Sequence, residues 1–562
     1  MRHAFLFCIL FLTTALHAEV KLPAIFSDGM VLQQAQLVRI WGTAEVGEDV
    51  KVNFGDQTHS SVTDPSGKWS IILNPMNANA KPMELVVAGK NTITLKNVLV
   101  GEVWICSGQS NMQWTVKQAG KAEEEIAAAN HVQIRMFNVE RAPSMTPQAD
   151  CKGAWKEATS ANVGDFSAVG YFFGRHLHQV LKVPVGLINT SWGGTRVEAW
   201  TSHEALDERP CAKDMLADWK DVVTKWDGAK EQAAFEKRKT DWQTQVKKID
   251  EENAKLPADK KQPKPQAPRP PEDPTKTPHH PSVLFNGMVA PLVPYAIKGA
   301  IWYQGESNQR RAFQYQELLP TMINDWRKQW VDAFSFYIVQ LANFGNGHPV
   351  TTDAGVPDTW AELQEAQTLT AQTLDKCGIV IINDIGDQND IHPKNKQEVG
   401  RRLALWALAK DYGKTGVEFS GPLYVSSVVQ GDKVRIQFDH TGTGLKTRDG
   451  GELKQFQITG ADQKWVWAKA RIEGNEVVVW SESVPQPVGV RYAWASWPEG
   501  ANLVNAEGLP ASCFRTDDFL PSTLGVVSPF KEAAAVKVEP VKAAPVKTEP
   551  VKDAAKPVAP KP

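Results

Sequence analysis

The sequence predicts an α/β protein in which a parallel β-sheet is covered by helices and flanked by β-rich modules. Between residues 98 and 414, short apolar runs of strand type alternate with longer stretches of helical periodicity. This order indicates βαβ units, which place helices on both faces of a parallel sheet. On either side, short runs of alternating apolar and polar residues are separated by Gly, Asp and Pro. Such spacing is typical of small sandwiches, so we expect one β-sandwich-like module at each end.

Composition narrows the class of protein. The chain has 562 residues, of which 42% are hydrophobic and 22% charged, and its formal net charge is −2. These values are typical of an ordinary globular protein of several domains. Because the charge is close to neutral, nucleic-acid binding has no electrostatic support, and we expect no nucleic-acid partner.

Residues 1–18 predict an export signal. Arg2 and His3 precede an apolar run at 4–12, and Ala15-Leu16-His17-Ala18 fits a small-x-small cleavage site. An uncleaved anchor is the alternative, but the apolar run is too short for a confident membrane span. We therefore expect a periplasmic or extracellular protein without a stable membrane span. The cysteines form no CxxC pair, so a zinc or thioredoxin-type site is not expected.

Residues 19–97 form the first expected module. The runs at 38–42, 50–54 and 69–73 alternate apolar and polar residues, as half-buried strands do. No constellation of acids and bases occurs there, so a structural or binding role is expected.

The core, residues 98–414, contains six strand candidates and four clear helix candidates. The strand candidates are residues 103–107, 132–137, 183–189, 300–303, 336–341 and 379–382, and the helix candidates are residues 166–181, 315–330, 363–374 and 396–409. An insertion at 204–280 interrupts this order with a charged helical stretch at 214–255 and a Pro/Lys-rich run at 261–271. We interpret the charged stretch as a surface helical hairpin rather than a binding arm, and the proline run as an extended, solvated connector.

Two further segments follow the core. Short strand candidates between 415 and 520 indicate a second β-rich module. Residues 529–562 contain Val-Lys-x-x-Pro repeats with almost no large apolar residue. Such a tail cannot bury a core, so we expect it to be disordered.

Ser110 is the first candidate for chemistry. It follows the strand candidate at 103–107 after a short Gly-Gln link, and reactive groups in such sheets lie at the carboxyl ends of strands. We interpret Ser110 as the nucleophile of an esterase. The G-x-S-x-G elbow is not met, because Asn111 and Met112 follow the serine. This argues against an ordinary α/β-hydrolase.

A serine hydroxyl needs a base and donors for the oxyanion. The base candidate is His392, in a polar loop that follows the last strand candidate and precedes the last helix candidate. Oxyanion donors could come from the Ser110 backbone, from Gly193 and Gly194, or from the Gln304 side chain. For the Gly-Gly pair, a plain turn is the alternative.

Four sequence blocks around these residues resemble those of the sialate O-acetylesterase family, which belongs to the SGNH-type serine hydrolases and carries the SASA domain. The blocks are Gly108-Gln109-Ser110-Asn111-Met112, Ser191-Trp192-Gly193-Gly194-Thr195 with Glu198, Trp302-Tyr303-Gln304-Gly305-Glu306-Ser307-Asn308, and Ile391-His392-Pro393. The resemblance implies a flavodoxin-like three-layer α/β/α core and deacetylation of O-acetylated sugars without metal or cofactor. By position, it implies that Ser110 is the nucleophile, that His392 is the base, and that Gly194 and Gln304 supply oxyanion donors.

The acid that orients the base stays open between two residues. Many SGNH hydrolases have an Asp three residues before the catalytic His, and here that position is Asn389. Asp390 is the nearer acid along the chain, and Glu306 in the third block is the other candidate.

Several residues near the blocks are candidates for sugar binding. Trp192 could cover the apolar face of a pyranose, with core packing as the alternative. Arg196 could meet the carboxylate of a sialic or uronic acid, or pair with Glu198 instead. Asn111, beside the nucleophile, is a further substrate-binding candidate.

The sequence thus predicts an exported serine esterase that removes O-acetyl groups from carbohydrates through an acyl-enzyme. A sugar or polysaccharide substrate is the expected partner. The alternatives are an acetylesterase for xylan or another polysaccharide, and a non-catalytic carbohydrate-binding envelope protein. The sequence does not indicate an oligomeric state.

Overall fold

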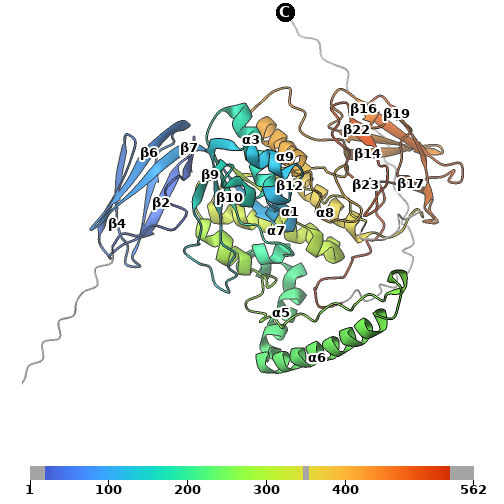
Figure 1. Cartoon of the computed structure of the whole chain (residues 1–562). Helices are drawn as coiled ribbons and strands as arrows, with labels where there is room; N and C mark the ends of the chain where they lie inside the picture. The colour runs from blue at the N-terminus through green and yellow to red at the C-terminus, as the bar shows by residue number, and fades with distance from the viewer. Residues whose placement is uncertain (1–18, 346–352, 532–562) are drawn as a thin grey trace, which may run out of the picture.

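The computed structural model describes residues 19–345 and 353–531. The expected signal at 1–18 and residues 532–562 of the expected tail lie outside these residues. The molecule has a central α/β body with a β-rich module at each end and a helical projection (Figure 1). Within the described residues, no helix is both long and apolar enough to cross a bilayer.

The central sheet has the strand order β13-β12-β11-β7-β10-β8-β9. All neighbours pair in parallel except β8 and β9, which are antiparallel. Its strands are β7 (Thr92–Gly108), β8 (Asn130–Asn138), β9 (Trp155–Thr159), β10 (Val185–Asn189), β11 (Gly299–Tyr303), β12 (Ser335–Val339) and β13 (Cys377–Val380). Strands β11 and β12 are buried along their whole length, as strands covered on both faces must be.

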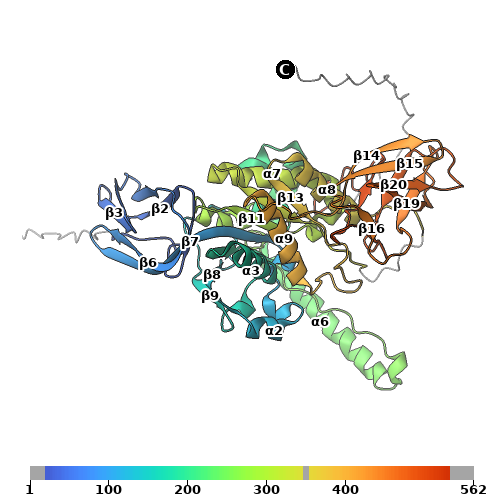
Figure 2. The same cartoon turned by 90° about the horizontal axis from the view of Figure 1, so that it is seen from above.

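Helices cover both faces of this sheet. The main helices are α3 (Ala168–Leu181), α7 (Ala312–Trp330), α8 (Thr359–Thr373) and α9 (Lys396–Lys410), and shorter ones are α1 (Ser110–Gln113), α2 (Ala122–Ala127) and α4 (His203–Asp207). Helix α3 packs against α9 and α7 against α8, and the two pairs lie on opposite sides of the sheet (Figure 2). Side chains cap three of the four N-termini: Ser167, Asp358 and Asn395 accept hydrogen bonds from the first turns of α3, α8 and α9.

Strand β7 links the N-terminal module to the core. Its first half pairs with β6 and β1, and its second half pairs with β10 and β11. The module's strands are β1 (Val31–Gln33), β2 (Val38–Thr43), β3 (Asp49–Phe54), β4 (Gln57–Val62), β5 (Lys68–Leu73) and β6 (Asn79–Ala88). Side chains from both regions form one continuous hydrophobic cluster. The expected boundary at 97/98 therefore falls inside a strand.

The C-terminal module has its own hydrophobic cluster. Its strands are β14 (Leu423–Gln430), β15 (Lys433–Asp439), β16 (Leu445–Thr447), β17 (Phe456–Thr459), β18 (Val466–Trp467), β19 (Lys469–Glu473), β20 (Glu476–Trp480), β21 (Gly489–Tyr492), β22 (Leu503–Asn505) and β23 (Phe514–Arg515). After β23 the chain returns to the core, where the Phe530 ring packs edge-on against Trp219 at a centroid distance of 4.9 Å.

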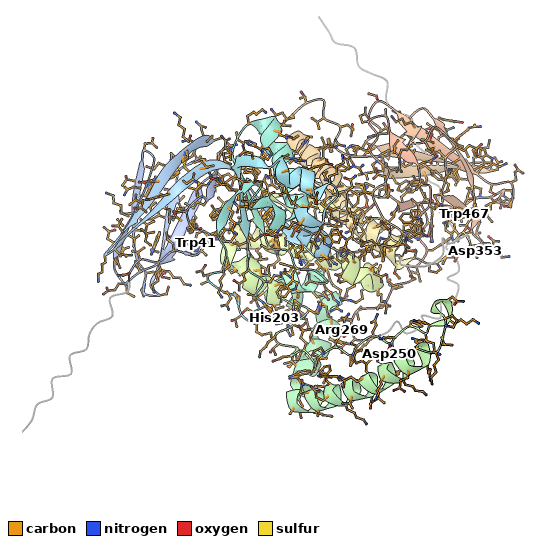
Figure 3. The ribbon with its side chains drawn as sticks, viewed as in Figure 1. Trp41, His203, Asp250, Arg269, Asp353 and Trp467 are labelled. Atoms are coloured by element: carbon orange, nitrogen blue, oxygen red, sulfur yellow. The ribbon has the colours of Figure 1, made fainter. Side chains whose placement is uncertain are left out.

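The insertion contains α5 (Lys213–Lys225) and the long α6 (Gly228–Asn253). Helix α6 projects from the body, and Asp250 and Arg269 mark the helix and the returning proline-rich run (Figure 3). That run packs on α6: Trp242 Nε1 donates to Pro265 O at 2.8 Å, and Asn253 Nδ2 donates to Gln262 O at 2.9 Å. The predicted helices are confirmed, and the proline-rich run is extended and mostly exposed as expected, but it also packs along α6.

The strand and helix candidates of the core are also confirmed, with ends shifted by a few residues, except that the candidate at 103–107 is the last part of the much longer β7 (Thr92–Gly108). The five described cysteines are free thiols.

Candidate active site

Strand β7 ends in a turn that presents Ser110. Gly108 has φ +133°, and a Cβ at this position would lie 2.2 Å from Tyr303 O. Only glycine fits such a close approach of β7 to β11. The chain then turns into α1, whose first residue is Ser110. Strand β7 lies where the chain order switches from one side of the sheet to the other, which is where ligands bind in open α/β sheets.

His392 reaches Ser110 from a loop far along the chain. The distance between His392 Nε2 and Ser110 Oγ is 2.9 Å, within hydrogen-bond reach. The loop follows β13, so its residues also lie at the carboxyl end of the sheet. The side chain of His392 is 25% exposed, which leaves the pair open to a substrate. The nucleophile–base pair predicted from the sequence is therefore brought together.

Asp390 lies on the other side of the imidazole. Its Oδ1 is 3.4 Å from His392 Nδ1 and also accepts the His392 backbone N–H at 2.9 Å. Asp387 Oδ1 in turn accepts the backbone N–H groups of Asn389 and Asp390, which shapes the loop. Asp390 thus takes the position expected for the acid that orients the base.

Trp114 stacks on the imidazole. The two rings are parallel within 11°, and their centroids are 4.9 Å apart. Burial is the main cause that lowers the pKa of His392 below its ordinary value, and the positive charge of Lys396 adds to this effect. The carboxylate of Asp390 acts in the opposite direction. The neutral imidazole, which is the form needed to accept a proton, is therefore favoured.

Glu306, the other candidate for orienting the base, has a different partner. Its Oε1 accepts from Asn111 Nδ2 at 2.7 Å, and its buried Oε2 has no hydrogen-bond partner within the described residues. Asn111 is 1% exposed, and its Oδ1 accepts from Lys396 Nζ at 2.5 Å. Asn111 was expected to contact the substrate. Its side chain is instead buried beside Ser110, where it connects Glu306 and Lys396.

Gln304, expected to donate to the oxyanion, is also committed elsewhere. It is fully buried; its Nε2 donates to Asn308 Oδ1 at 2.7 Å and to Thr195 O at 3.2 Å, and its Oε1 accepts from Tyr315 at 2.8 Å. These bonds use both hydrogens of the amide nitrogen, so the Gln304 side chain connects buried groups of the fold and has no hydrogen left for an oxyanion.

The Gly193-Gly194 pair lies against Ser110. A Cβ on Gly193 would lie 3.2 Å from Ser110 Cβ, so the absence of a side chain lets the two segments touch. The Gly193 N–H donates to Gln113 Oε1 at 2.6 Å. In the described part of the chain, the backbone N–H groups of Ser110 and Gly194 donate no hydrogen bond. These two N–H groups, in the turn of Ser110 and in the Gly-Gly loop that touches it, are thus available as donors.

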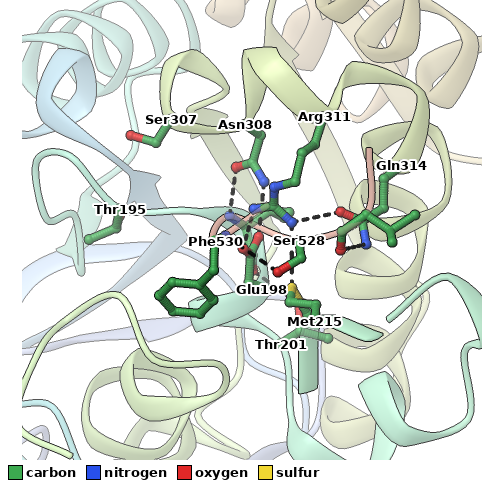
Figure 4. A network of polar contacts seen from close by, with 12 residues as sticks. Thr195, Glu198, Thr201, Met215, Ser307, Asn308, Arg311, Gln314, Ser528 and Phe530 are labelled. Carbon is green, nitrogen blue, oxygen red and sulfur yellow. Dashed lines mark hydrogen bonds and ion pairs between the residues drawn. The ribbon is translucent and has the colours of Figure 1, made fainter. Parts of the chain in front are cut away.

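A buried polar network supports the Gly-Gly loop (Figure 4). Glu198 Oε1 pairs with Arg311, and Glu198 Oε2 accepts from Asn308 Nδ2 at 2.9 Å. Although burial acts to raise the pKa of Glu198, the charges of Arg311 and Arg196 and the Asn308 hydrogen bond hold it below its ordinary value. Arg311 also donates to Gln314 Oε1 at 2.6 Å, and Gln314 binds Val527 O at 2.9 Å, which links the loop to the returning C-terminal segment.

Two predicted substrate contacts lie at the edge of this network. Trp192 is half-buried, and the Arg141 guanidinium lies 5.8 Å from its ring centroid. Arg196 is half-buried; its backbone carbonyl accepts from Ala199, whereas its guanidinium makes no hydrogen bond or ion pair among the described residues. The Glu198 oxygens are bound to Arg311 and Asn308, and no direct ion pair joins Arg196 to Glu198, although the two charges interact electrostatically.

Lys396 is the site residue that the sequence did not reveal. It is the first residue of α9, where a cation opposes the helix dipole, and it is completely buried. A lysine in the first turn, four residues after the candidate base, is the signal that could have drawn attention to it.

Comparisons with known proteins bear on the family of this chain. Residues 100–234 and 283–408 match the family described as carbohydrate esterase, sialic acid-specific acetylesterase. The interruption falls on α6 and the proline-rich run.

The sialate O-acetylesterase of Rattus norvegicus is 29% identical over 500 residues, covering 82% of this chain and 86% of the relative. That of Homo sapiens is 28% identical over 521 residues, covering 85% and 88%. The crystal structure of a carbohydrate acetylesterase from Xanthomonas citri is 36% identical, with a TM-score of 0.74, and the match covers 89% of this chain and 100% of that one.

Fold and relatives together define a carboxylic ester hydrolase of the carbohydrate esterase class. The chain belongs to the sialate O-acetylesterase family.

Proposed function

We propose that this enzyme removes O-acetyl groups from carbohydrates through a Ser110 acyl-enzyme, with His392 as general base and Asp390 as the acid that orients it. The observation that carries the proposal is the distance of 2.9 Å between Ser110 Oγ and His392 Nε2. A neutral imidazole that directs its Nδ1–H towards Asp390 leaves Nε2 free to accept the serine proton.

The reaction follows from this geometry. Ser110 Oγ attacks the acetyl carbonyl carbon while His392 Nε2 takes its proton. The oxyanion accepts hydrogen bonds from the free backbone N–H groups of Ser110 and Gly194. His392 then gives this proton to the departing sugar oxygen as the bond between that oxygen and the acetyl carbon breaks. In the second step, His392 takes a proton from water, which attacks the acyl-enzyme; the ester bond to Ser110 breaks, acetate leaves, and the proton returns to Ser110 Oγ. The backbone donors replace the Gln304 side chain, whose amide hydrogens are used inside the fold.

Strand order supports an SGNH-type, flavodoxin-like core. Five of the parallel strands have the spatial order β10-β7-β11-β12-β13. When β8, which is parallel to β10 and lies between β7 and β10 in the chain, is left out of the numbering, this is the order 2-1-3-4-5 of flavodoxin-like sheets. Strands β8 and β9 extend the sheet beyond β10.

The substrate class is an O-acetylated carbohydrate. The relatives are named sialate O-acetylesterases and a carbohydrate acetylesterase, so both an O-acetylated sialic acid and an acetylated polysaccharide such as xylan are candidates. The Arg196 guanidinium feels the charge of Glu198 but makes no hydrogen bond or ion pair among the described residues, so it is suited to the carboxylate of an acidic sugar. Acetate release from O-acetylated sialic acid and from acetylated xylan, measured side by side, distinguishes the two. We also propose export on the basis of residues 1–18; N-terminal sequencing of the mature protein, expected to begin at Glu19, tests this.

The Ser110→Ala variant tests the mechanism. We expect turnover of a chromogenic acetyl ester to fall by at least about a thousandfold while the circular dichroism spectrum is unchanged. An organophosphonate should label Ser110 in the wild type. Full activity in Ser110→Ala would remove this residue from its role, and a wild type without burst or labelling would favour a non-catalytic binding protein.

A further inference from the structure

A single amide separates two buried charged groups behind the nucleophile. Asn111 Oδ1 accepts from Lys396 Nζ at 2.5 Å, and Asn111 Nδ2 donates to Glu306 Oε1 at 2.7 Å. An ammonium can only donate and a carboxylate can only accept, so these neighbours fix the orientation of the amide. The three side chains form a cation–amide–carboxylate bridge.

The same amide connects the nucleophile to the base. Asn111 follows Ser110 directly, and its Nδ2 also donates to Ile391 O at 3.0 Å, one residue before His392. The turn after β7 and the loop after β13 are thus held through one side chain. A shift of either segment would change the contact between Ser110 Oγ and His392 Nε2.

Lys396 is unfavourable for stability where it stands. It is completely buried at the N-terminal end of α9, and burial, which disfavours the ammonium, lowers its pKa to about 7. Its Nζ lies 5.6 Å from the centroid of Trp114 and 5.2 Å from that of Tyr303, which stabilises the cation. A costly cation with such specific partners indicates a role beyond folding.

The charges around the imidazole are few. His392 faces Asp390, whose carboxylate favours protonation, and Lys396, whose ammonium opposes it. Lys396 itself faces Glu306 and Asp390. Burial, together with the charge of Glu306, raises the pKa of the Tyr303 phenol. Burial also raises the pKa of Glu306 itself.

We propose that Lys396, held by Asn111 opposite Glu306, is a positioning residue that fixes the Ser110–His392 geometry and supplies the positive charge that opposes protonation of the free base. This inference rests on the proposed function. The consequence is an imidazole that stays neutral in mildly acid solution, because the nearby Lys396 charge makes it harder to protonate. Removal of that charge should make protonation easier.

The test compares pH profiles of kcat/KM for an aryl acetate in the wild type and in Lys396→Met, Lys396→Arg and Lys394→Met. Lys394 is exposed and two residues away, so its replacement removes the same formal charge outside the bridge. We expect the acid limb to move up by about one pH unit in Lys396→Met and to stay in place in Lys394→Met. Lys396→Arg, which keeps the charge, should restore the wild-type limb. In Lys396→Met, kcat should fall by about tenfold or more with a smaller change in KM.

The double variant Lys396→Met/Glu306→Gln guards against misfolding, because it leaves no unpaired buried charge. It should show the same displaced acid limb. An unmoved limb in Lys396→Met or in the double variant overturns the inference. Failure of both to fold also overturns it, since Lys396 would then be a folding residue. A wild type without ester hydrolysis or Ser110 labelling defeats the proposed function instead.

Discussion

Ser110 and His392 are 282 residues apart in the chain, yet Ser110 Oγ and His392 Nε2 lie 2.9 Å apart. The parallel sheet produces this proximity, because the carboxyl ends of β7 and β13 meet at the same edge. The long stretch of chain between β7 and β13, including the insertion at 204–280, therefore does not prevent this contact.

The first prediction concerns Asp390. In Asp390→Asn, kcat/KM should fall by about ten- to a hundredfold, because the imidazole loses its orienting carboxylate. The loss should be smaller than for a buried acid, since the side chain of Asp390 is 44% exposed. The carboxylate raises the pKa of His392, so the acid limb should move to lower pH, opposite to the direction expected for Lys396→Met. Asp375→Asn, at an exposed position, is the control, and a drop of equal size there would contradict the assignment.

The wild-type pH profile gives a second prediction. The pKa of His392 is lowered below its ordinary value of 6.5, mainly by burial. Its base form therefore persists below pH 6.5, and the midpoint of the acid limb of kcat/KM should lie under that value. Steady-state rates with an aryl acetate, whose leaving group needs no protonation, measure this midpoint. A midpoint above pH 7 would be inconsistent with the environment of His392.

A third prediction tests the turn that presents the nucleophile. Gly108→Ala places a Cβ 2.2 Å from Tyr303 O, so we expect a loss of at least about 2 kcal/mol in the free energy of unfolding and a displaced Ser110. Gly431, with φ +65° and no atom near its missing Cβ, is a matched control. Gly431→Ala should cost only about 1 kcal/mol and retain activity. Urea unfolding and ester turnover report both effects, and equal losses would disprove the close-approach argument.

A fourth prediction concerns the buried pair of Glu198 and Arg311. Glu198→Gln should lower the free energy of unfolding by about 3 to 5 kcal/mol near neutral pH, because Arg311 is left without its counter-charge. The folded-state pKa of Glu198 lies below 4.5, so this stabilisation is complete above that pH and is lost as the pH falls through the folded-state pKa.

The difference in stability between wild type and Glu198→Gln should therefore shrink in acid, as urea unfolding at several pH values would reveal. The double variant Glu198→Leu/Arg311→Met should recover much of the lost stability. A pH-independent difference would show that the charge is not the cause.

Much of this molecule follows from local sequence patterns. The alternation of strand and helix predicts the elements of the core, and the blocks around Ser110 and His392 bring forward the pair that the fold places in contact. Trp242 and Pro265 show a limit, since neither pattern indicates that the proline run returns along α6. Lys396 shows another, because its partner Asn111 lies 285 residues away and periodicity carries no information on such contacts. The sequence predicts correctly that Gln304 and Asn111 lie at the carboxyl end of the sheet. It does not predict that their amides bond inside the fold, because side-chain packing determines the direction of each amide.

Strand β7 has a consequence for how the enzyme holds together. Seventeen residues, Thr92–Gly108, belong to one hydrogen-bonded ribbon that begins in the N-terminal module and ends beside the nucleophile. The module cannot separate from the core as an independent unit, because β7 is paired in both regions and separation would break this pairing. Unfolding of the module and loss of activity should accordingly be a single cooperative event, because the N-terminal module anchors the strand that leads to Ser110.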